Sequence, residues 1–174
     1  PSPGELIDIG GYRLHINCTG GGSPTVVIDA GWGDWSTAWG FVQPKVAKTT
    51  RVCTYDRAGT GWSDAGPLPR DATQFAEELH TLLQNAHIPG PYVLAGHSLG
   101  GLPVRVFTGM YPSEVAGVVL IDSMTPEQFT QPPAEAQSQS DSQSQPLSLP
   151  AMLARFGVVR LLARPLGLVP SKSP

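Results

Sequence analysis

The residues with the clearest capacity for chemistry form the stretch Gly96-His97-Ser98-Leu99-Gly100, where a serine lies between glycines. A serine hydroxyl becomes a nucleophile when a base takes its proton and N–H groups stabilise the oxyanion that forms on the substrate. The pattern G-x-S-x-G is typical of a serine on a sharp turn from strand to helix, where larger neighbouring side chains would collide with backbone. The stretch predicts acyl transfer through Ser98; the alternative is that Ser98 only caps a helix.

This interpretation requires a strand before Ser98 and a helix after it. The apolar run at 92–97 predicts the strand, and residues 99–111 predict the helix, with a kink at Pro103. Upstream, we expect an antiparallel ribbon that turns at Gly10-Gly11, and further strands at 25–31, 51–56 and 115–122. Helices are expected at 36–50, which Pro44 shortens or kinks, and at 71–90, with Ser36 and Asp71 as N-caps. Such alternation predicts an α/β fold, a mostly parallel sheet flanked by helices.

Two N–H groups are candidates for the oxyanion hole. Leu99 follows the serine at a helix N-terminus, where the helix dipole also favours negative charge. The second donor is expected from the loop after the strand at 25–31, where Gly31 allows a turn and Trp32 offers its N–H; the alternative is an ordinary glycine turn. Around them we expect an apolar substrate pocket with contributions from Gly31, Trp32, Trp35, His97 and Phe129.

Composition limits the remaining possibilities. The 174 residues are 40% hydrophobic, which suffices for one ordinary domain, and we assign its core to residues 1–125. A net charge of -3, with 14% charged residues, provides no basic surface for nucleic acid. No apolar run is long enough to span a membrane. Residues 126–146 are rich in Gln, Ser and Pro and predict a flexible linker. Residues 147–174 predict amphipathic helices. These helices have three possible roles: to form a lid, to pack on the core, or to lie on a membrane surface.

The two cysteines, Cys18 and Cys53, have two possible states. Free cysteines are usually buried as small apolar side chains. A disulfide between them would favour an extracytoplasmic setting; the compartment is otherwise not predicted.

Three segments together resemble the α/β-hydrolase superfamily, most closely its serine esterase-like members: VVIDAGWGDW (26–35), YDRAGTGWSD (55–64) and GHSLGG (96–101). The resemblance extends from Glu5 to Asp122. It implies a sheet of strand order 1-2-4-3-5-6-7-8, a nucleophile after strand 5 and a lid after strand 6. That order brings the end of strand 2 beside the start of strand 4, which favours a disulfide between Cys18 and Cys53.

The histidines depart from the family's pattern. Catalytic triads in this family follow the chain order serine, acid, histidine, yet all four histidines lie before Ser98. We expect His15 to be a surface residue, His80 and His87 to be solvated on a helix, and His97 to support the turn that carries Ser98.

The sequence also departs from the family's pattern in its catalytic acid and in its last two strands. Asp122 ends the sixth strand, where a few family members, including the haloalkane dehalogenases, carry the catalytic acid; otherwise it has a structural hydrogen-bonding role. Strands 7 and 8 cannot be found in the sequence. We expect that this chain is the N-terminal part of a hydrolase, incomplete after strand 6 and the start of the lid, and that a complementary C-terminal polypeptide supplies the histidine and pairs with the edge of strand 6.

The predicted function is a serine hydrolase that acts on small-molecule carboxylic esters through an acyl-enzyme on Ser98, with no metal and no cofactor. In this superfamily dehalogenases and epoxide hydrolases use an aspartate at the nucleophile position, so the serine argues against both activities. Peptidase, lactonase, thioesterase and perhydrolase activities stay open. So does a different class of function, a hydrolase-like binding or scaffold protein without catalysis.

Overall fold

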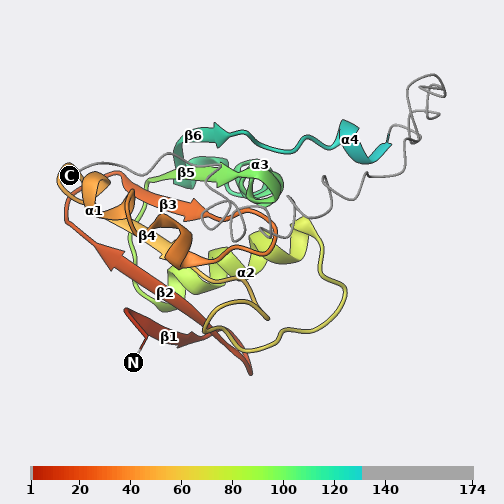
Figure 1. Ribbon diagram of the computed structural model, residues 1–174, viewed down its shortest axis with the longest axis horizontal. Coiled ribbons are helices and arrows are strands. Elements are labelled where there is room, and N and C mark those ends of the chain that lie inside the picture. The colour runs from red at the N-terminus through yellow and green to blue at the C-terminus, as the bar shows by residue number, and fades with distance from the viewer. Residues whose placement is uncertain (1, 131–174) are drawn as a thin grey trace, which may run out of the picture. The chain divides into compact units, whose positions relative to one another are not determined.

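A sheet of six strands runs through residues 2–130, the part of the chain that the computed structural model describes. Its strand order is β1-β2-β4-β3-β5-β6 (Figure 1). The strands are β1 (Glu5–Asp8), β2 (Arg13–Thr19), β3 (Thr25–Asp29), β4 (Val52–Tyr55), β5 (Tyr92–His97) and β6 (Val115–Ile121). The helices are η1 (Ser36–Trp39), α1 (Gln43–Val46), α2 (Ala72–Asn85), η2 (Ser98–Gly100), α3 (Gly101–Met110), η3 (Pro112–Glu114) and α4 (Glu127–Thr130). The strand order is the one implied for the first six strands of a hydrolase, and the predicted α/β fold class is confirmed.

The direction of the strands determines where the chemistry can gather. β1, β2 and β4 are joined by antiparallel pairing, whereas β3, β4, β5 and β6 run parallel to one another. The carboxyl ends of parallel strands meet at one edge of a sheet, and ligands bind in the crevice outside that edge. The loops that carry Gly31, Ser98 and Asp122 leave the sheet there, after β3, β5 and β6 respectively.

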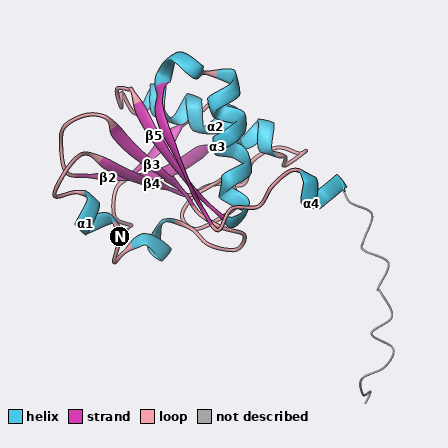
Figure 2. Cartoon of the chain, turned by 90° about the horizontal axis from the view of Figure 1, so that it is seen from above, coloured by secondary structure: helices cyan, strands magenta, loops and turns pink. Residues whose placement is uncertain are grey.

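Helices cover the two faces of the sheet unequally (Figure 2). The larger core lies under α2 and α3, where Leu79 and Phe107 pack with Leu94 of β5. The smaller core lies on the other face, where Val46 of α1 packs against Ile28 and its neighbours. The α2 helix begins as predicted, because the Asp71 carboxylate accepts a hydrogen bond from the N–H of Gln74 at 2.9 Å.

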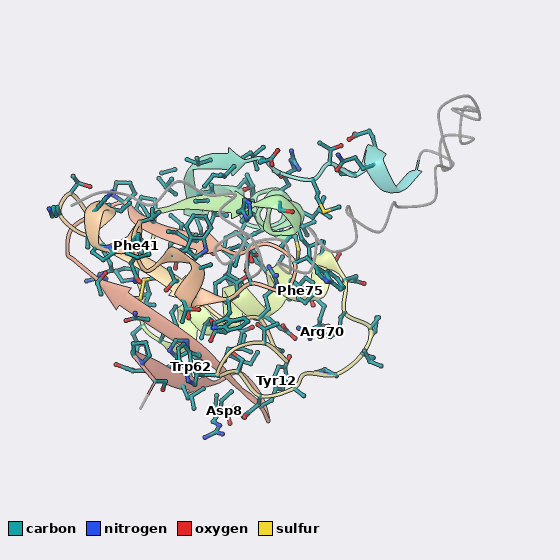
Figure 3. The ribbon with its side chains drawn as sticks, in the orientation of Figure 1. Asp8, Tyr12, Phe41, Trp62, Arg70 and Phe75 are labelled. Atoms are coloured by element: carbon teal, nitrogen blue, oxygen red, sulfur yellow. A yellow bond between two sulfur atoms is a disulfide. The ribbon has the colours of Figure 1, made fainter. Side chains whose placement is uncertain are left out.

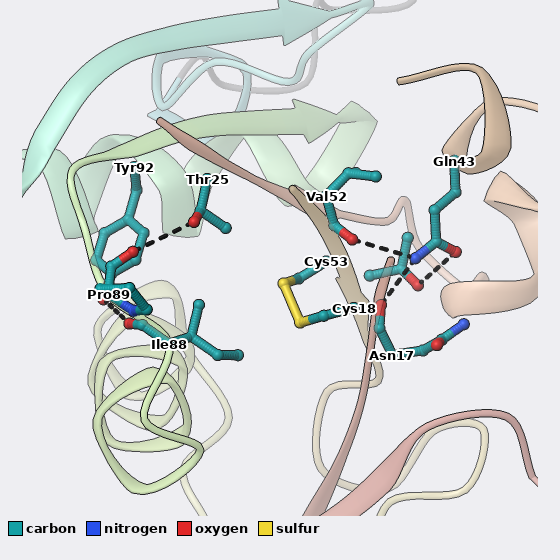
Figure 4. The surroundings of a disulfide bond; sticks show 10 residues. Asn17, Cys18, Thr25, Gln43, Val52, Cys53, Ile88, Pro89 and Tyr92 are labelled. Carbon is teal, nitrogen blue, oxygen red and sulfur yellow. Dashed lines mark hydrogen bonds between the residues drawn. A yellow bond between two sulfur atoms is a disulfide. The ribbon is translucent and has the colours of Figure 1, made fainter. Parts of the chain in front are cut away.

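The predicted ribbon and disulfide are both present. Ile9 N–H donates to Tyr12 O across Gly10-Gly11, and both glycines have a positive φ, which explains why glycine is used at this turn. Cys18 of β2 and Cys53 of β4 are register partners with Cα atoms 4.0 Å apart, and they form a disulfide (Figure 4).

Two helix predictions are wrong. Instead of one helix over 36–50, the chain forms the short η1 and α1, and Trp35 rather than Ser36 occupies the N-cap of η1. Pro44 lies in the first turn of α1, where a missing N–H costs nothing. The kink expected at Pro103 is absent for the same reason, since Pro103 lies in the first turn of an uninterrupted α3.

The predicted lid at 147–174 and all but residues 126–130 of the predicted linker lie outside the described residues. Between residues 2 and 130, none of the helices has both the length and the apolar character needed to cross a membrane.

Candidate active site

Ser98 lies at the turn that joins β5 to the helical segment η2–α3, as the sequence predicts. Its φ is +49°, a left-handed conformation that few non-glycine residues adopt and that commonly marks a functional site. Ser98 is half-buried, and no hydrogen bond to its hydroxyl is recorded among the described residues. The Oγ therefore has no recorded protein partner within residues 2–130.

Two glycines make this turn possible by allowing backbones to touch. A Cβ on Gly96 would lie 2.5 Å from Gly100 O, and a Cβ on Gly100 would lie 2.5 Å from Asp29 O. Real Cβ atoms essentially never approach a heavy atom so closely. The turn at Ser98 is thus packed directly against the end of β3, and this contact holds the β3 loop beside Ser98.

Gly31 begins the loop that the sequence assigns to the oxyanion hole. A Cβ on Gly31 would lie 2.9 Å from His97 Nδ1 and 3.4 Å from Ser98 Cβ, so the loop passes immediately beside Ser98. The next residue, Trp32, is 82% exposed, and no acceptor for its backbone N–H is recorded within residues 2–130. Leu99 lies in the first helical turn, whose N–H groups have no acceptor inside the helix. Both predicted donors are therefore near Ser98.

The sequence reasoning missed the role of Arg57, which lies in the loop after β4. Its side chain is 6% exposed. It forms an ion pair with the buried Asp29 and donates to Ala30 O and Gly31 O, both at 2.7 Å. A signal was present in the sequence. One buried strand ends in Asp29 and another is followed by Arg57, so opposite charges lie at the same edge of the sheet.

Asp29 is a carboxyl group held in a wholly buried site. Burial raises the pKa of Asp29, and Arg57 and the hydroxyl of Tyr55, which donates at 2.7 Å, oppose that rise. Burial together with the Asp29 charge raises the pKa of Tyr55 well above its usual value. Tyr55 is therefore a neutral donor at ordinary pH, and it binds Oδ2 of Asp29 while Arg57 binds Oδ1.

A pocket of about 560 Å³ opens beside the two residues predicted to form the oxyanion hole. Trp32 and Leu99 both line it, with Phe75 and Leu102 among its apolar walls. The guanidinium of Arg70 lies 4.8 Å from the Phe75 ring, and Figure 3 shows the two side chains together. Arg70 also pairs with the buried Glu78, so its charge is neutralised within the wall. The pocket suits an apolar group of a substrate.

The other residues predicted for the pocket lie elsewhere or are not described. Gly31 and His97 do not line this pocket but contact each other at the turn, and the His97 ring lies edge-on to Trp39 at 6.0 Å. Trp35 is 39% exposed at the start of η1 and does not line the pocket. The side chain of Phe129 lies outside the described residues.

Asp122 leaves the sheet next to Ser98. His97 of β5 is the register partner of Ile121 of β6, so the residues that follow, Ser98 and Asp122, emerge from adjacent strands. Met124 N–H donates to Ser98 O at 2.9 Å, which ties the loop after β6 to the turn. Asp122 is exposed and has a φ of +41°. Within the described part of the chain no partner for its carboxylate is recorded, so the predicted structural hydrogen-bonding role gains no support.

The histidines were predicted with mixed success. The surface position predicted for His15 is wrong: it is fully buried, its Nδ1 lies 3.1 Å from Asp56 Oδ2, and the Trp62 ring covers it at 4.8 Å. His80 is less solvated than predicted, because it stacks on Tyr111 at 3.8 Å. His87 is exposed as expected. None of these contacts joins a described histidine to the Ser98 hydroxyl.

No metal-binding cluster is present between residues 2 and 130, where no group of three or more His, Cys, Asp or Glu side chains could hold an ion.

Comparison with known proteins identifies the family. Residues 24–152 match the model of the alpha/beta hydrolase fold, so this chain belongs to the α/β-hydrolase family. The protein named "Probable transporter efuK" from Hormonema carpetanum is 35% identical over 135 residues, which cover 73% of this chain and 19% of that protein.

Solved structures agree on the fold. A thermophilic esterase from Thermogutta terrifontis has a TM-score of 0.63 at 26% identity, over 72% of this chain and 49% of the esterase. The epoxide hydrolase CorEH also has a TM-score of 0.63 at 26% identity, over 69% of this chain and 42% of CorEH. The chain therefore spans less than half the length of each of these three proteins.

Proposed function

We propose that this chain carries the nucleophile and the oxyanion hole of a serine hydrolase that acts on small-molecule carboxylic esters. The observation that carries the proposal is the left-handed Ser98, which leaves β5 beside the loop of Gly31. That geometry puts a hydroxyl without a recorded protein partner next to two N–H groups suited to a developing oxyanion. An esterase of similar fold is among the solved structures, which supports this activity.

The reaction proceeds in two balanced steps. Ser98 Oγ attacks the ester carbonyl while a histidine takes its proton, and the N–H groups of Leu99 and Trp32 hold the resulting oxyanion. Collapse of this tetrahedral intermediate breaks the bond to the alcohol, which leaves with the proton from the histidine, and Ser98 stays acylated. Water then attacks the acyl group, gives a proton to the histidine, and releases the carboxylic acid as the serine regains its proton.

A complementary C-terminal polypeptide supplies that histidine and completes the sheet. The support is the edge of β6, which pairs with β5 on one side in the described structure. Four consecutive apolar residues of β6, Val118, Val119, Leu120 and Ile121, are 37–47% exposed. An apolar strand at an open sheet edge is a template for another strand. Asp122 is the candidate acid, because it emerges beside Ser98.

Ser98 separates esterase chemistry from the epoxide hydrolase activity named for CorEH. Epoxide hydrolases and dehalogenases of this superfamily use an aspartate at the nucleophile position, whereas this chain has serine there. Lactonase, thioesterase, peptidase and perhydrolase reactions use the same serine chemistry, and a panel of esters, lactones, thioesters and peptides ranks them by kcat/KM.

The test is a hydrolysis assay with 4-nitrophenyl esters on the chain combined with its complementary segment. We expect a burst of nitrophenol equal to the enzyme concentration if the acyl-enzyme accumulates, and steady release otherwise; Ser98→Ala should abolish both. Activity that survives Ser98→Ala would contradict the role proposed for Ser98. No turnover by a folded complex would favour the binding or scaffold alternative.

A further inference from the structure

We propose that Arg57 is a positioning residue that fixes the direction of the Trp32 N–H in the oxyanion hole. This inference rests on the function proposed for Ser98. It assigns to a nearly buried guanidinium in the wall of the pocket control over the direction of one of the two donors that would stabilise the transition state.

The contacts of Arg57 concentrate on the β3 loop. One nitrogen, Nη1, contacts the Asp29 carboxylate and donates to Ala30 O at 2.7 Å. The other, Nη2, donates to Gly31 O at 2.7 Å. Two consecutive carbonyl groups of the loop are thus held by one planar, rigid fork, which suits the geometry of arginine.

Holding a carbonyl group also fixes the N–H of the next residue. Gly31 C=O and Trp32 N–H belong to one peptide unit, whose atoms lie in a plane with the two groups pointing in opposite directions when the bond is trans. The cis peptide bonds among the described residues all precede prolines, so the unit that joins Gly31 to Trp32 is trans. Because Gly31 O points to Arg57, the Trp32 N–H points away from Arg57, and no acceptor for it is recorded within residues 2–130.

Besides Arg57, Asp34 N–H donates to Gly31 O at a longer distance, 3.4 Å, and the remaining contacts fix the base of the loop. Tyr55 OH donates to Asp29 Oδ2 at 2.7 Å, and Gly100 packs on the Asp29 and Ala30 backbone. Neither residue contacts Gly31 O. Tyr55→Phe is therefore a matched control, because it weakens the same buried cluster without releasing the carbonyl that orients the Trp32 N–H.

The experiment compares Arg57→Lys with Tyr55→Phe in the chain combined with its complementary segment. Lysine keeps the charge for Asp29 but lacks the planar fork that holds both carbonyl groups. Active sites are titrated with a fluorophosphonate, so that kcat refers to folded enzyme. The readouts are kcat and KM for a 4-nitrophenyl ester, and the Ki of a trifluoromethyl ketone, whose adduct with serine places an oxyanion in the hole.

We expect Arg57→Lys to lower kcat per titrated site about 10- to 100-fold and to raise the Ki of the ketone by a similar factor, with little change in KM. The reason is that displacing an oxyanion donor by about 1 Å lowers the rate by about this factor. Tyr55→Phe should lower the Tm without changing kcat per site or Ki. Trimethylamine N-oxide, which favours compact states, keeps a destabilised variant folded during the assay.

Three outcomes overturn the proposal. One is an Arg57→Lys enzyme whose kcat per site and Ki equal those of the wild type. Another is equal loss in both variants, which would make the role of Arg57 purely structural. Failure of the wild-type complex to react with the fluorophosphonate refutes the function proposed for Ser98 as well, so the two failures are distinguishable.

Discussion

Gly100→Ala is the most direct structural test of the turn at Ser98. The added Cβ would lie 2.5 Å from Asp29 O and 2.7 Å from Ala30 O. Both obstacles are backbone atoms, which cannot rotate away as a flexible side chain can. The substitution therefore forces the turn and the β3 loop apart.

The size of the effect follows from the distances. The closest approach is 0.9 Å short of the 3.4 Å at which ordinary contact begins. Forcing such a shift in a packed region costs about 1–3 kcal/mol of stability. The same shift moves the Trp32 N–H away from Ser98 by nearly the same amount, and a misplacement of about 1 Å lowers a rate about 100-fold.

Gly109→Ala is the matched control, since it makes the same substitution in α3, the helix that directly follows Gly100. No atom lies within 4 Å of a Cβ at Gly109. Alanine should therefore stabilise the helix by about 0.5–1 kcal/mol. Urea unfolding measures both variants, and ester hydrolysis measures the rates. A Gly100→Ala protein as stable and as active as Gly109→Ala would refute the argument that close backbone packing holds the site.

Three further predictions concern the frame of the fold. Replacing Cys18 and Cys53 by alanine should cost about 4 kcal/mol in urea unfolding, because the disulfide spans 35 residues and restricts the unfolded chain; equal midpoints would contradict this. Glu78→Ala removes a carboxylate that is 3% exposed and should lower the free energy of unfolding by about 3–5 kcal/mol. Glu77→Ala, at an exposed position, should change it by no more than about 0.5 kcal/mol. Similar losses in both variants would contradict the role of the buried ion pair. Burial, with the hydrogen bond to Glu78, raises the pKa of Tyr12 to about 12. The contribution of Tyr12 to stability should therefore persist below pH 10 and disappear as the pH rises through about 12. An ultraviolet titration of wild type against Tyr12→Phe that shows the transition of Tyr12 near pH 10 would contradict this prediction.

The sequence was informative where function imposes a local pattern. The glycines around Ser98 could be interpreted from sequence because a sharp strand-to-helix turn excludes side chains on either side of it. The pairing of Cys18 with Cys53 followed from the strand order that the family resemblance implied.

Features that depend on contacts between distant segments were not predictable. His15 alternates with Leu14 and Ile16 along β2, which suggests a solvent face, but the loop after β4 folds over that face and buries it under Trp62. The charges after β3 and β4 indicate that Asp29 and Arg57 lie at the same sheet edge, but the hydrogen bonds from Arg57 to the β3 loop carbonyls depend on how the two loops fold, which no local pattern specifies.

Intact-mass and peptide analysis after treatment with a fluorophosphonate probe shows directly whether Ser98 is the nucleophile. We expect one adduct per chain, located on Ser98, when the complementary segment is present, and none after Ser98→Ala. A folded complex that stays unlabelled, or whose adduct lies on another residue, would refute this role of Ser98.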